Sequence, residues 1–424
     1  MARTFQELGV ATDYSPNWGM RQDEFIPALR GRDGIKKFRE MRENDPVVGA
    51  ILMAMDMMIR SVEWRVEDGD EAGREFVMSV MHDMDATWEA FISDVLSFLP
   101  YGFSLFEVVM KRRADGMIGL KKLAPRPQHT IDRFEVTDKG QVLGVWQVAA
   151  QRNVYMPYSR LLHFRTVNGN GEPTGRSVLR NAYTSWRAQN EIKYIEAVAI
   201  ERELNGLPIV SVPSEYLSPD ATAAQTAFIN QIKKIARDVK RNEQGYIILP
   251  SDRYVDDDGK LSSAKMVEFD LIASKGTRDI DTSKVILRYQ QDMARSVMAD
   301  FIMLGANDRG SFALSKSKAD LFLKALEGFM GTICATLNRR LLPMLWEANG
   351  MDMANMPKIV SGRVAPIDID ELGQFVQRLS LAGVDLFPDD TLELHLRNVA
   401  GLPAPDPNRP PRMAEQDATD TGAE

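Results

Sequence analysis

The apolar positions between Asp45 and Glu67 follow a helical spacing first and a strand spacing afterwards (DPVVGAILMAMDMMIRSVEWRVE). Asp45 carries a side-chain acceptor that suits a helix N-cap. Pro46 suits the first turn because the N–H that it lacks has no partner there. Beyond residue 60 the apolar residues recur at every second position, which is the spacing of a strand. This alternation places three apolar side chains on one face: Val62, Trp64 and Val66. The pattern therefore predicts a helix that runs directly into a half-buried strand.

Short helices and strands are predicted from there to residue 166. Apolar residues at helical spacing predict helices over 71–84 and 88–99, the second with Thr87 as its cap. Asp115-Gly116 and Lys139-Gly140 are typical hairpin turns. The strands that adjoin these turns are expected at 103–111, 117–123, 130–137, 142–149 and 161–166. This order predicts an α+β unit with an antiparallel sheet.

Two long helices are predicted after the glycine-rich loop at 168–175 (NGNGEPTG). The first runs from Ser177 to Leu204, which is about 40 Å long, and stops at Asn205-Gly206. The second is expected over 281–304. Their apolar stripes are expected to pack through Tyr183 and Trp186 on the first helix and through Tyr289, Met293 and Val297 on the second.

A small module separates the two long helices. It is predicted to contain a helix at 222–240, a polar turn at 256–259 (DDDG), and three strands at 207–212, 245–249 and 265–271. After a break at 305–311, helices are expected at 313–347, with Asn349-Gly350 as the stop, and at 370–382. A short element is expected near 390–396. The last part is rich in proline and ends in acidic residues. Such a composition does not form a packed core, so we expect it to be disordered.

Composition narrows the class of protein. The chain has 424 residues, of which 44% are apolar and 26% charged, with a net charge of −8 and a pI of about 5.3. Proteins that wrap nucleic acid tightly are usually basic, so any contact with DNA is expected to be loose or local. Cys334 is the single cysteine, which excludes an intrachain disulfide, and it is expected to be a small buried residue. We expect neither a signal peptide nor a membrane span.

Patterns for catalysis or metal binding are weak. The four histidines lack metal-ligand spacing. The loop over 169–177 departs from a phosphate-binding loop because Asn170 replaces its first glycine and Arg176 its lysine. The DDDG run is too compact for an EF-hand. Three aspartates on predicted helices do not have the arrangement of a two-metal site: Asp292, Asp300 and Asp320. We expect no catalytic residue, no metal and no cofactor.

Four segments, taken in order, resemble portal proteins of tailed bacteriophages. The first is DPVVGAILMAMDMMIRSVEWRVE. The second, YGFSLFEVVMK, is similar to the G-x-S-x-x-E strand of that family. The third, RLLHFRTVNGNGEPTGRSVLRNAY, resembles its strand, Gly-Pro loop and helix start. The fourth, FALSKSKADLFLKALEGFMGTICATLNRRLLPMLWEANG, has similar N-x-x-L and N-G endings. The likeness covers Asp45 to Gly350, and a Mu-like or prophage origin is compatible with it.

The resemblance implies a portal-type α+β fold with named regions. These are an N-terminal arm and short helix (1–44), an antiparallel-sheet wing (45–175), two stem helices (176–205 and 276–304), a small α/β clip module (206–275), a channel loop (305–317), late wing and crown helices (318–400) and a disordered tail (401–424).

The resemblance also implies a function. Portal proteins form a ring of about twelve subunits at one capsid vertex, and double-stranded DNA passes through it during packaging and ejection. The implied partners are other copies of the chain, the terminase large subunit, a head–tail adaptor and the major capsid or scaffold protein. The implied location is the virion, with the host cytoplasm during assembly and no membrane. The implied channel-loop residues are Asn307, Arg309, Ser311, Lys316 and Lys318.

Two other classes of function stay open on the sequence alone. One is a different phage structural protein, such as a tail or baseplate part. The other is a nucleic-acid-processing enzyme that uses residues 168–177. A ring with a central hole favours the portal, a fibre or trimer favours the tail part, and metal-dependent DNA cleavage that is lost on changing one aspartate favours the enzyme.

Overall fold

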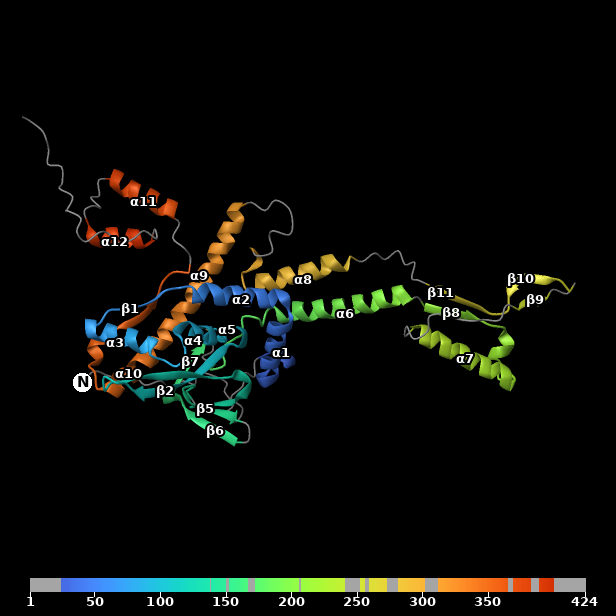
Figure 1. The fold of residues 1–424 in the computed structure, drawn as a ribbon, viewed down its shortest axis with the longest axis horizontal. Coiled ribbons are helices and arrows are strands. Elements are labelled where there is room, and N and C mark those ends of the chain that lie inside the picture. Colours follow the sequence, from blue (N-terminus) through green and yellow to red (C-terminus); the bar gives the residue numbers. More distant parts are fainter. Residues whose placement is uncertain are drawn as a thin grey trace, which may run out of the picture.

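The computed structural model describes residues 24–137, 139–149, 152–166, 172–205, 207–240, 252–255, 259–272, 281–301, 312–364, 369–382 and 389–399. The molecule is elongated (Figure 1). A body of helices and small sheets occupies one end, and two neighbouring helices, α6 and α8, extend from it toward a small module at the other end.

The body begins with the elements predicted from the opening pattern. They are η1 (Pro27–Leu29), α1 (Gly31–Asn44), α2 (Pro46–Arg60) and β1 (Trp64–Glu67). The side chain of Asp45 caps α2 by accepting from the amides of Val47 and Val48 at 2.9 and 3.0 Å. β1 pairs antiparallel with β12 (Lys358–Ser361), a strand from the late part of the chain that was not predicted.

Two three-stranded antiparallel sheets follow, with strand orders β3-β2-β7 and β4-β5-β6. The elements in chain order are α3 (Glu71–His82), α4 (Trp88–Val95), α5 (Phe98–Tyr101), β2 (Phe103–Arg112), β3 (Ile118–Arg126), η2 (Gln128–Thr130), β4 (Ile131–Val136), β5 (Val142–Ala149), β6 (Arg152–Pro157), η3 (Tyr158–Arg160) and β7 (Leu161–Arg165). The predicted Thr87 cap is confirmed, since its hydroxyl accepts from the amide of Ala90 at 3.2 Å. The helix expected over 88–99 is divided into α4 and α5, and β6 was missed.

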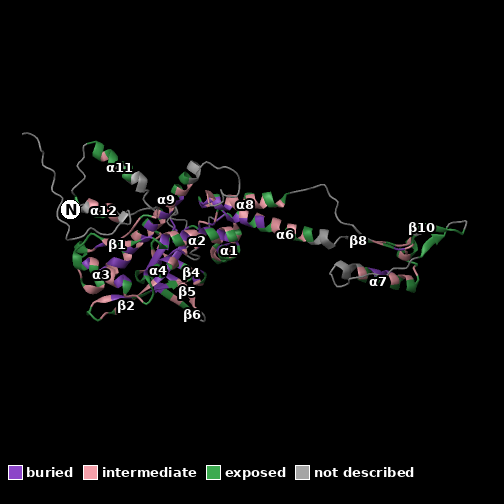
Figure 2. Ribbon diagram, turned by 45° about the horizontal axis from the view of Figure 1, so that its top comes forward, coloured by how far each residue is buried: buried purple, intermediate pink, exposed green. Residues whose placement is uncertain are grey.

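The main hydrophobic core lies in the body, where buried residues concentrate (Figure 2). It joins α2, α3 and α4 to the β2 sheet and to the late helices. Trp346 of α10, Phe106 of β2 and Phe164 of β7 are fully buried in it. Truncating one such aromatic side chain to alanine costs about 3–5 kcal/mol, so this packing fixes the two halves of the chain to each other.

The module at the far end comprises β8 (Leu207–Ser211), η4 (Ser214–Leu217), α7 (Ala223–Lys240), β9 (Arg253–Val255), β10 (Leu261–Lys265) and β11 (Glu268–Ile272). β8 pairs antiparallel with β11, and β9 with β10. The strand expected at 245–249 lies outside the described residues. α6 (Tyr183–Asn205) enters the module, and α8 (Thr282–Ser296) lies beside α6.

The late helices are α9 (Phe312–Thr336), a π-helical turn (Leu337–Leu341), α10 (Leu342–Asn349), η7 (Met353–Asn355), α11 (Ile369–Leu381) and α12 (Asp390–Val399). The π turn precedes Pro343, whose ring would clash with the carbonyl four residues earlier in a regular helix. α10 ends at Gly350 in the left-handed conformation, with φ 65°, as the Asn-Gly pair predicted.

Two predicted helix boundaries are wrong. α8 ends at Ser296 rather than at 304, because Met298 adopts φ 59° and turns the chain. α6 begins at Tyr183 rather than at 177. The Ser177 hydroxyl donates to the Pro100 carbonyl at 2.6 Å and accepts from the Leu179 amide at 3.0 Å, which holds a turn there. The channel loop that the resemblance implied at 305–317 overlaps α9, which begins at Phe312, within one residue of the helix start predicted at 313.

The fold is therefore a mixed one, as the fold class α+β predicted, with small antiparallel sheets and long helices. Among the described residues, no helix combines the length and apolar character that crossing a membrane requires.

Candidate assembly and channel surfaces

The first turn of α6, which carries Tyr183 and Trp186 and is called its foot below, is buried inside the subunit. Tyr183 and Trp186 pack with their rings 5.9 Å apart in a second core cluster that also contains Met293 of α8 and Phe38 of α1. Val297 is buried in the main core, and Tyr289 is half-buried under the guanidinium of Arg288, 5.2 Å from the ring centroid. The structure thus brings most of the predicted stem-packing residues together, but as an intramolecular core.

Two buried polar contacts fix the direction of α6. Gln189, which is 0% exposed, donates from Nε2 to Oδ2 of Asp45 at 3.0 Å. The carboxylate of Asp45 therefore caps α2 with one oxygen and holds α6 with the other. Just before α6, the guanidinium of Arg180 donates to both carboxylate oxygens of the buried Glu24 at 2.7 and 3.1 Å. Such bidentate pairs are geometrically specific.

The loop that leads into α6 packs at Gly175 against Gly102, which caps the end of α5. Gly102 and Gly175 have φ of 92° and 58°, a region that residues with a side chain rarely adopt. A Cβ on Gly175 would lie 2.2 Å from the carbonyl oxygen of Gly102, so neither position has room for a larger residue. The Arg176 amide also donates to the Thr166 hydroxyl at 2.7 Å. These contacts and those of Ser177 occupy the Arg176 amide and the Ser177 hydroxyl, two groups that a phosphate-binding loop would need.

Beyond its foot, α6 exposes large apolar side chains. Tyr194, Ile195 and Ile200 are 72%, 61% and 51% exposed. By the helical period of 3.6 residues they point to different sides of α6, and among the described elements α8 lies beside it. Three large exposed apolar side chains within two turns of a protruding helix indicate contacts with other molecules on more than one side, because burial of apolar surface is favourable. Sequence reasoning did not single out Tyr194 or Ile200, because it assigned the packing role to the first turn of the helix.

The predicted channel residues are only partly described. Asn307, Arg309 and Ser311 lie outside the described residues. Lys316 is exposed near the start of α9. Lys318 is half-buried and pairs with Asp300 at 2.6 Å, so it ties the start of α9 to the segment after α8. These two lysines therefore belong to a helix and not to a loop.

The hairpin of the small far module exposes three apolar side chains. Tyr254 and Val255 of β9 and Leu261 of β10 are all exposed, and Gly259 between the strands adopts φ 72°.

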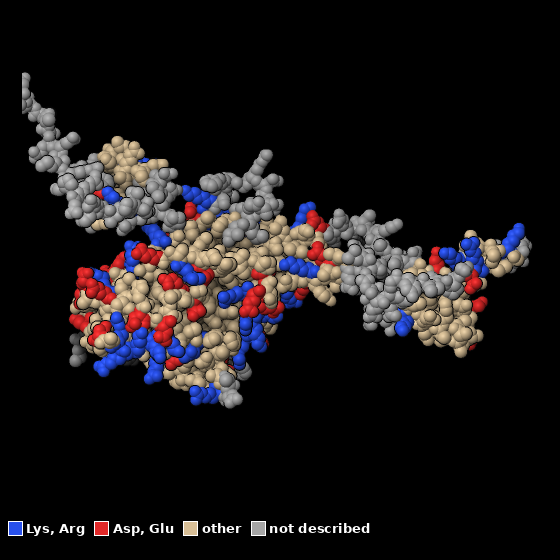
Figure 3. All heavy atoms as spheres, in the orientation of Figure 1, with Lys and Arg blue, Asp and Glu red and all other residues tan. Residues whose placement is uncertain are grey.

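Charged residues of both signs are interspersed over the visible face of the body (Figure 3). That face shows no extended surface of one sign for a nucleic acid to wrap.

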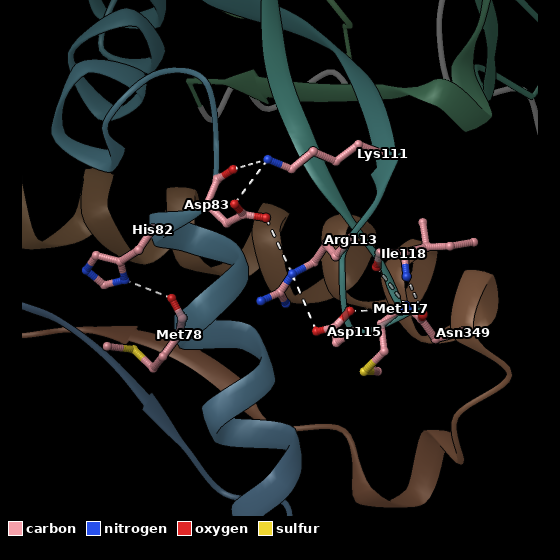
Figure 4. A network of polar contacts seen from close by, with 9 residues as sticks. All are labelled: Met78, His82, Asp83, Lys111, Arg113, Asp115, Met117, Ile118 and Asn349. Carbon is pink, nitrogen blue, oxygen red and sulfur yellow. Dashed lines mark hydrogen bonds and ion pairs between the residues drawn. The ribbon is translucent and has the colours of Figure 1, made fainter.

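At the opposite end of the body, a polar network fixes the tip of the β2–β3 hairpin (Figure 4). The carboxylate of Asp83, at the end of α3, pairs with Lys111 at 3.2 Å and with Arg113 at 3.4 Å. The side-chain amide of Asn349 accepts from the Ile118 amide at 2.8 Å and donates to its carbonyl at 2.9 Å. The network joins three distant segments, and local spacing gave no signal for it.

Two titratable groups with shifted pKa values, His163 and Cys334, have structural roles. His163 is buried between Tyr158 and the Pro173 carbonyl, to which Nε2 donates at 2.8 Å, so Nδ1 accepts from the Tyr158 hydroxyl at 3.2 Å. Burial, with the nearby charges of Arg165 and Arg340, lowers its pKa to about 3. Cys334, which was expected to be buried, is only half-buried, and this partial burial raises the pKa of its thiol. Within the described ranges, no group of three or more His, Cys, Asp or Glu side chains could hold a metal ion.

The family model for the portal protein of Mu bacteriophage matches residues 35–396, most of the chain. The chain belongs to this portal protein family. The resemblance seen in the sequence is therefore confirmed, and with it the identification as a phage portal protein.

Solved structures support the fold. A chain in the virion of a native gene transfer agent particle matches with a TM-score of 0.53 and 11% identity, covering 88% of this chain and 94% of that one. A chain in the neck of an empty gene transfer agent particle matches with a TM-score of 0.52 and 12% identity, covering 87% of this chain and 94% of that one. An HK97 family phage portal protein from Corynebacterium diphtheriae shares 13% identity over 75% of this chain and 92% of that one, with a TM-score of 0.41 that is too low to bear on the fold.

Proposed function

We propose that copies of this portal protein close into a ring of about twelve subunits at one capsid vertex, with double-stranded DNA passing through the centre. A closed ring needs two different faces of the subunit that meet at an angle which closes. The observation that supports this proposal most is the exposed apolar surface of α6, formed by Tyr194, Ile195 and Ile200. Burial against neighbouring stems in a ring removes this surface from water.

In the proposed ring, α6 and α8 are the stem, residues 206–275 the clip, residues 45–175 the wing, and residues 318–400 the late wing and crown. The exposed hairpin residues Tyr254, Val255 and Leu261 of the clip are the docking surface for the terminase large subunit and then for a head–tail adaptor. Aromatic and aliphatic side chains are the usual anchors of such interfaces. The wing would contact the capsid or scaffold protein.

The charge of the chain suits a conduit. With a net charge of −8, the ring makes few phosphate contacts, so DNA slides instead of binding statically. We assign the channel contacts to residues 302–311 and to the adjoining turns of α9 with Lys316. Lys318 is a weaker candidate because Asp300 already neutralises its ammonium group.

Changing the α6 surface tests the proposal. Tyr194→Lys combined with Ile195→Lys is expected to leave the subunit folded, because both side chains are exposed, and to prevent ring formation by placing like charges at the interface. The control is Leu143→Lys, which alters an apolar residue on β5, away from the stem, that is 49% exposed. Native mass spectrometry reads out the result. Rings that form normally from the double variant would refute the stem interface.

Neither alternative class gains support from a described contact. An enzyme acting through residues 168–177 would need free groups at Arg176 and Ser177. The Arg176 guanidinium donates to Asn181 at 2.9 Å, and the Ser177 hydroxyl is held by two backbone groups.

A further inference from the structure

A cavity of about 90 Å³ lies under the first half of α1, where the described chain begins. Its floor is apolar and is formed by Ile35, Phe38, Phe103, Ile131 and Phe134. All of these except Ile35 are buried. Four arginines and two carboxylates line the cavity as well. Arg180 is paired with Glu24, and Arg133 with Asp132, whereas Arg32 and Arg176 donate to neutral groups. An apolar floor with cations at its edge suits an aromatic side chain, whose ring face attracts cations.

The first described residue of the chain, Glu24, lies at the wall of this cavity. Glu24 lines the cavity, and its carboxylate is held by Arg180 at 2.7 and 3.1 Å and by the Ile26 amide at 3.1 Å. Its carbonyl accepts from Nε of Arg30 at 2.8 Å. Because both the side chain and the backbone of Glu24 are fixed, the segment that precedes it must start at this point.

The sequence places a suitable occupant within reach. Trp18 stands six residues before Glu24, and six extended residues span at most about 20 Å. An engineered cavity of about 150 Å³ binds benzene, so about 90 Å³ with an open mouth accommodates a planar ring in part and leaves the indole N–H near water. Asp23 next to the anchor and Asp13 beyond Trp18 complement Arg32 and Arg176, which donate to the neutral His129 carbonyl and Asn181 side chain.

We propose that Trp18 inserts into this cavity of its own chain, so that residues 18–24 strap α1 to the sheet β4-β5-β6 and to Arg180 at the foot of α6. The strap acts within one subunit and holds whether or not that subunit is in a ring. It would stiffen the junction between the wing and the stem, because the cavity is lined by residues of both.

Limited trypsin digestion of the full-length protein tests the strap. Arg21 lies between Trp18 and the fixed Glu24, whereas Arg3 lies far outside the proposed strap. Cleavage after Arg21 is expected to be about tenfold faster in Trp18→Ala than in the unaltered protein, since proteolysis follows the open population. Cleavage after Arg3 is expected to be the same in both. The control Phe5→Ala removes an aromatic residue of the same arm outside the strap and should change neither rate. Equal cleavage after Arg21 with and without Trp18 would overturn the proposal.

A disulfide assay provides a second test that keeps Trp18. In a Cys334→Ser background, Asn17→Cys is combined with Arg32→Cys on the cavity wall. The proposal predicts an intramolecular disulfide, seen as a faster-migrating monomer on a non-reducing gel. Phe5→Cys with Arg32→Cys is the control and should form far less of it. A ladder of cross-linked subunits would place a neighbour's arm in the cavity and, like the absence of any disulfide, would contradict the same-chain strap.

Discussion

Oδ2 of Asp45 accepts a hydrogen bond from Nε2 of Gln189 at 3.0 Å, and both side chains are buried. Residues 144 positions apart are thus joined at the point where the long helix α6 leaves the body. The same carboxylate caps α2, so one side chain sets the direction of two helices.

Asp45→Ala is expected to destabilise the subunit by about 2–4 kcal/mol. The loss of a cap costs about 1 kcal/mol, and the unpaired buried amide of Gln189 costs about 1–3 kcal/mol more. Thr87→Ala removes a cap alone, on the exposed start of α4, and is expected to cost only about 1 kcal/mol. Urea unfolding of both variants measures the difference. Equal losses would show that the link to Gln189 does not contribute.

Trp186→Glu is expected to unfold or strongly destabilise the single subunit, by more than about 4 kcal/mol, because it buries a charge in an apolar cluster. The loss of rings in this variant would follow from the loss of the fold and would say nothing about the interface. Circular dichroism and urea unfolding of dilute subunits check this. A Trp186→Glu protein that is normally folded would show that the foot of α6 is not part of the core.

His163 predicts a pH dependence of stability. Its pKa is lowered to about 3 in the folded chain, against 6.5 when unfolded. Above pH 6.5 the His163 ring is neutral in both the folded and the unfolded state, and its contribution to the free energy of unfolding is fully present. As the pH falls from 6.5 toward 3, the unfolded state takes up a proton that the folded state does not, and stability falls by up to about 1.4 kcal/mol per pH unit.

His163→Gln should remove this part of the pH dependence while the carboxylates titrate as before. The free energy of unfolding, measured at pH 7 and pH 5, is expected to fall more in the unaltered protein than in the variant. Identical decreases would contradict a buried neutral His163.

Removal of residues 307–311 is expected to leave ring assembly intact and to impair DNA packaging or retention. Phe312 already belongs to α9, so the deletion spares that helix. Packaging assays with the variant ring, with electron microscopy to confirm the ring itself, test the expectation. Normal packaging would refute the channel assignment of this loop.

The sequence predicted the fold best where the signal was local. The Asp45 cap, the Asp115-Gly116 hairpin and the Gly350 stop are all confirmed, because each depends on a few neighbouring residues. β12 was missed because the strand exists only through its pairing with β1, nearly 300 residues earlier. The early end of α8 was missed because Met298 adopts a left-handed conformation that nothing in its local sequence requires.

The candidate surfaces were harder to predict for a related reason. The apolar pattern of α6 cannot show which of its apolar residues face the body and which face outward. Trp186 and Tyr194 are both large aromatic residues on one helix, yet the first is buried against α1 and the second is mostly exposed. Only the three-dimensional position of α1 separates them.

Native mass spectrometry of the full-length protein, with negative-stain imaging of the same sample, tests the central claim most directly. A chain of 47.7 kDa is expected to form one closed species of about twelve subunits with a central hole. A protein that stays monomeric at high concentration under all assembly conditions, or that forms fibres or trimers, would contradict this account.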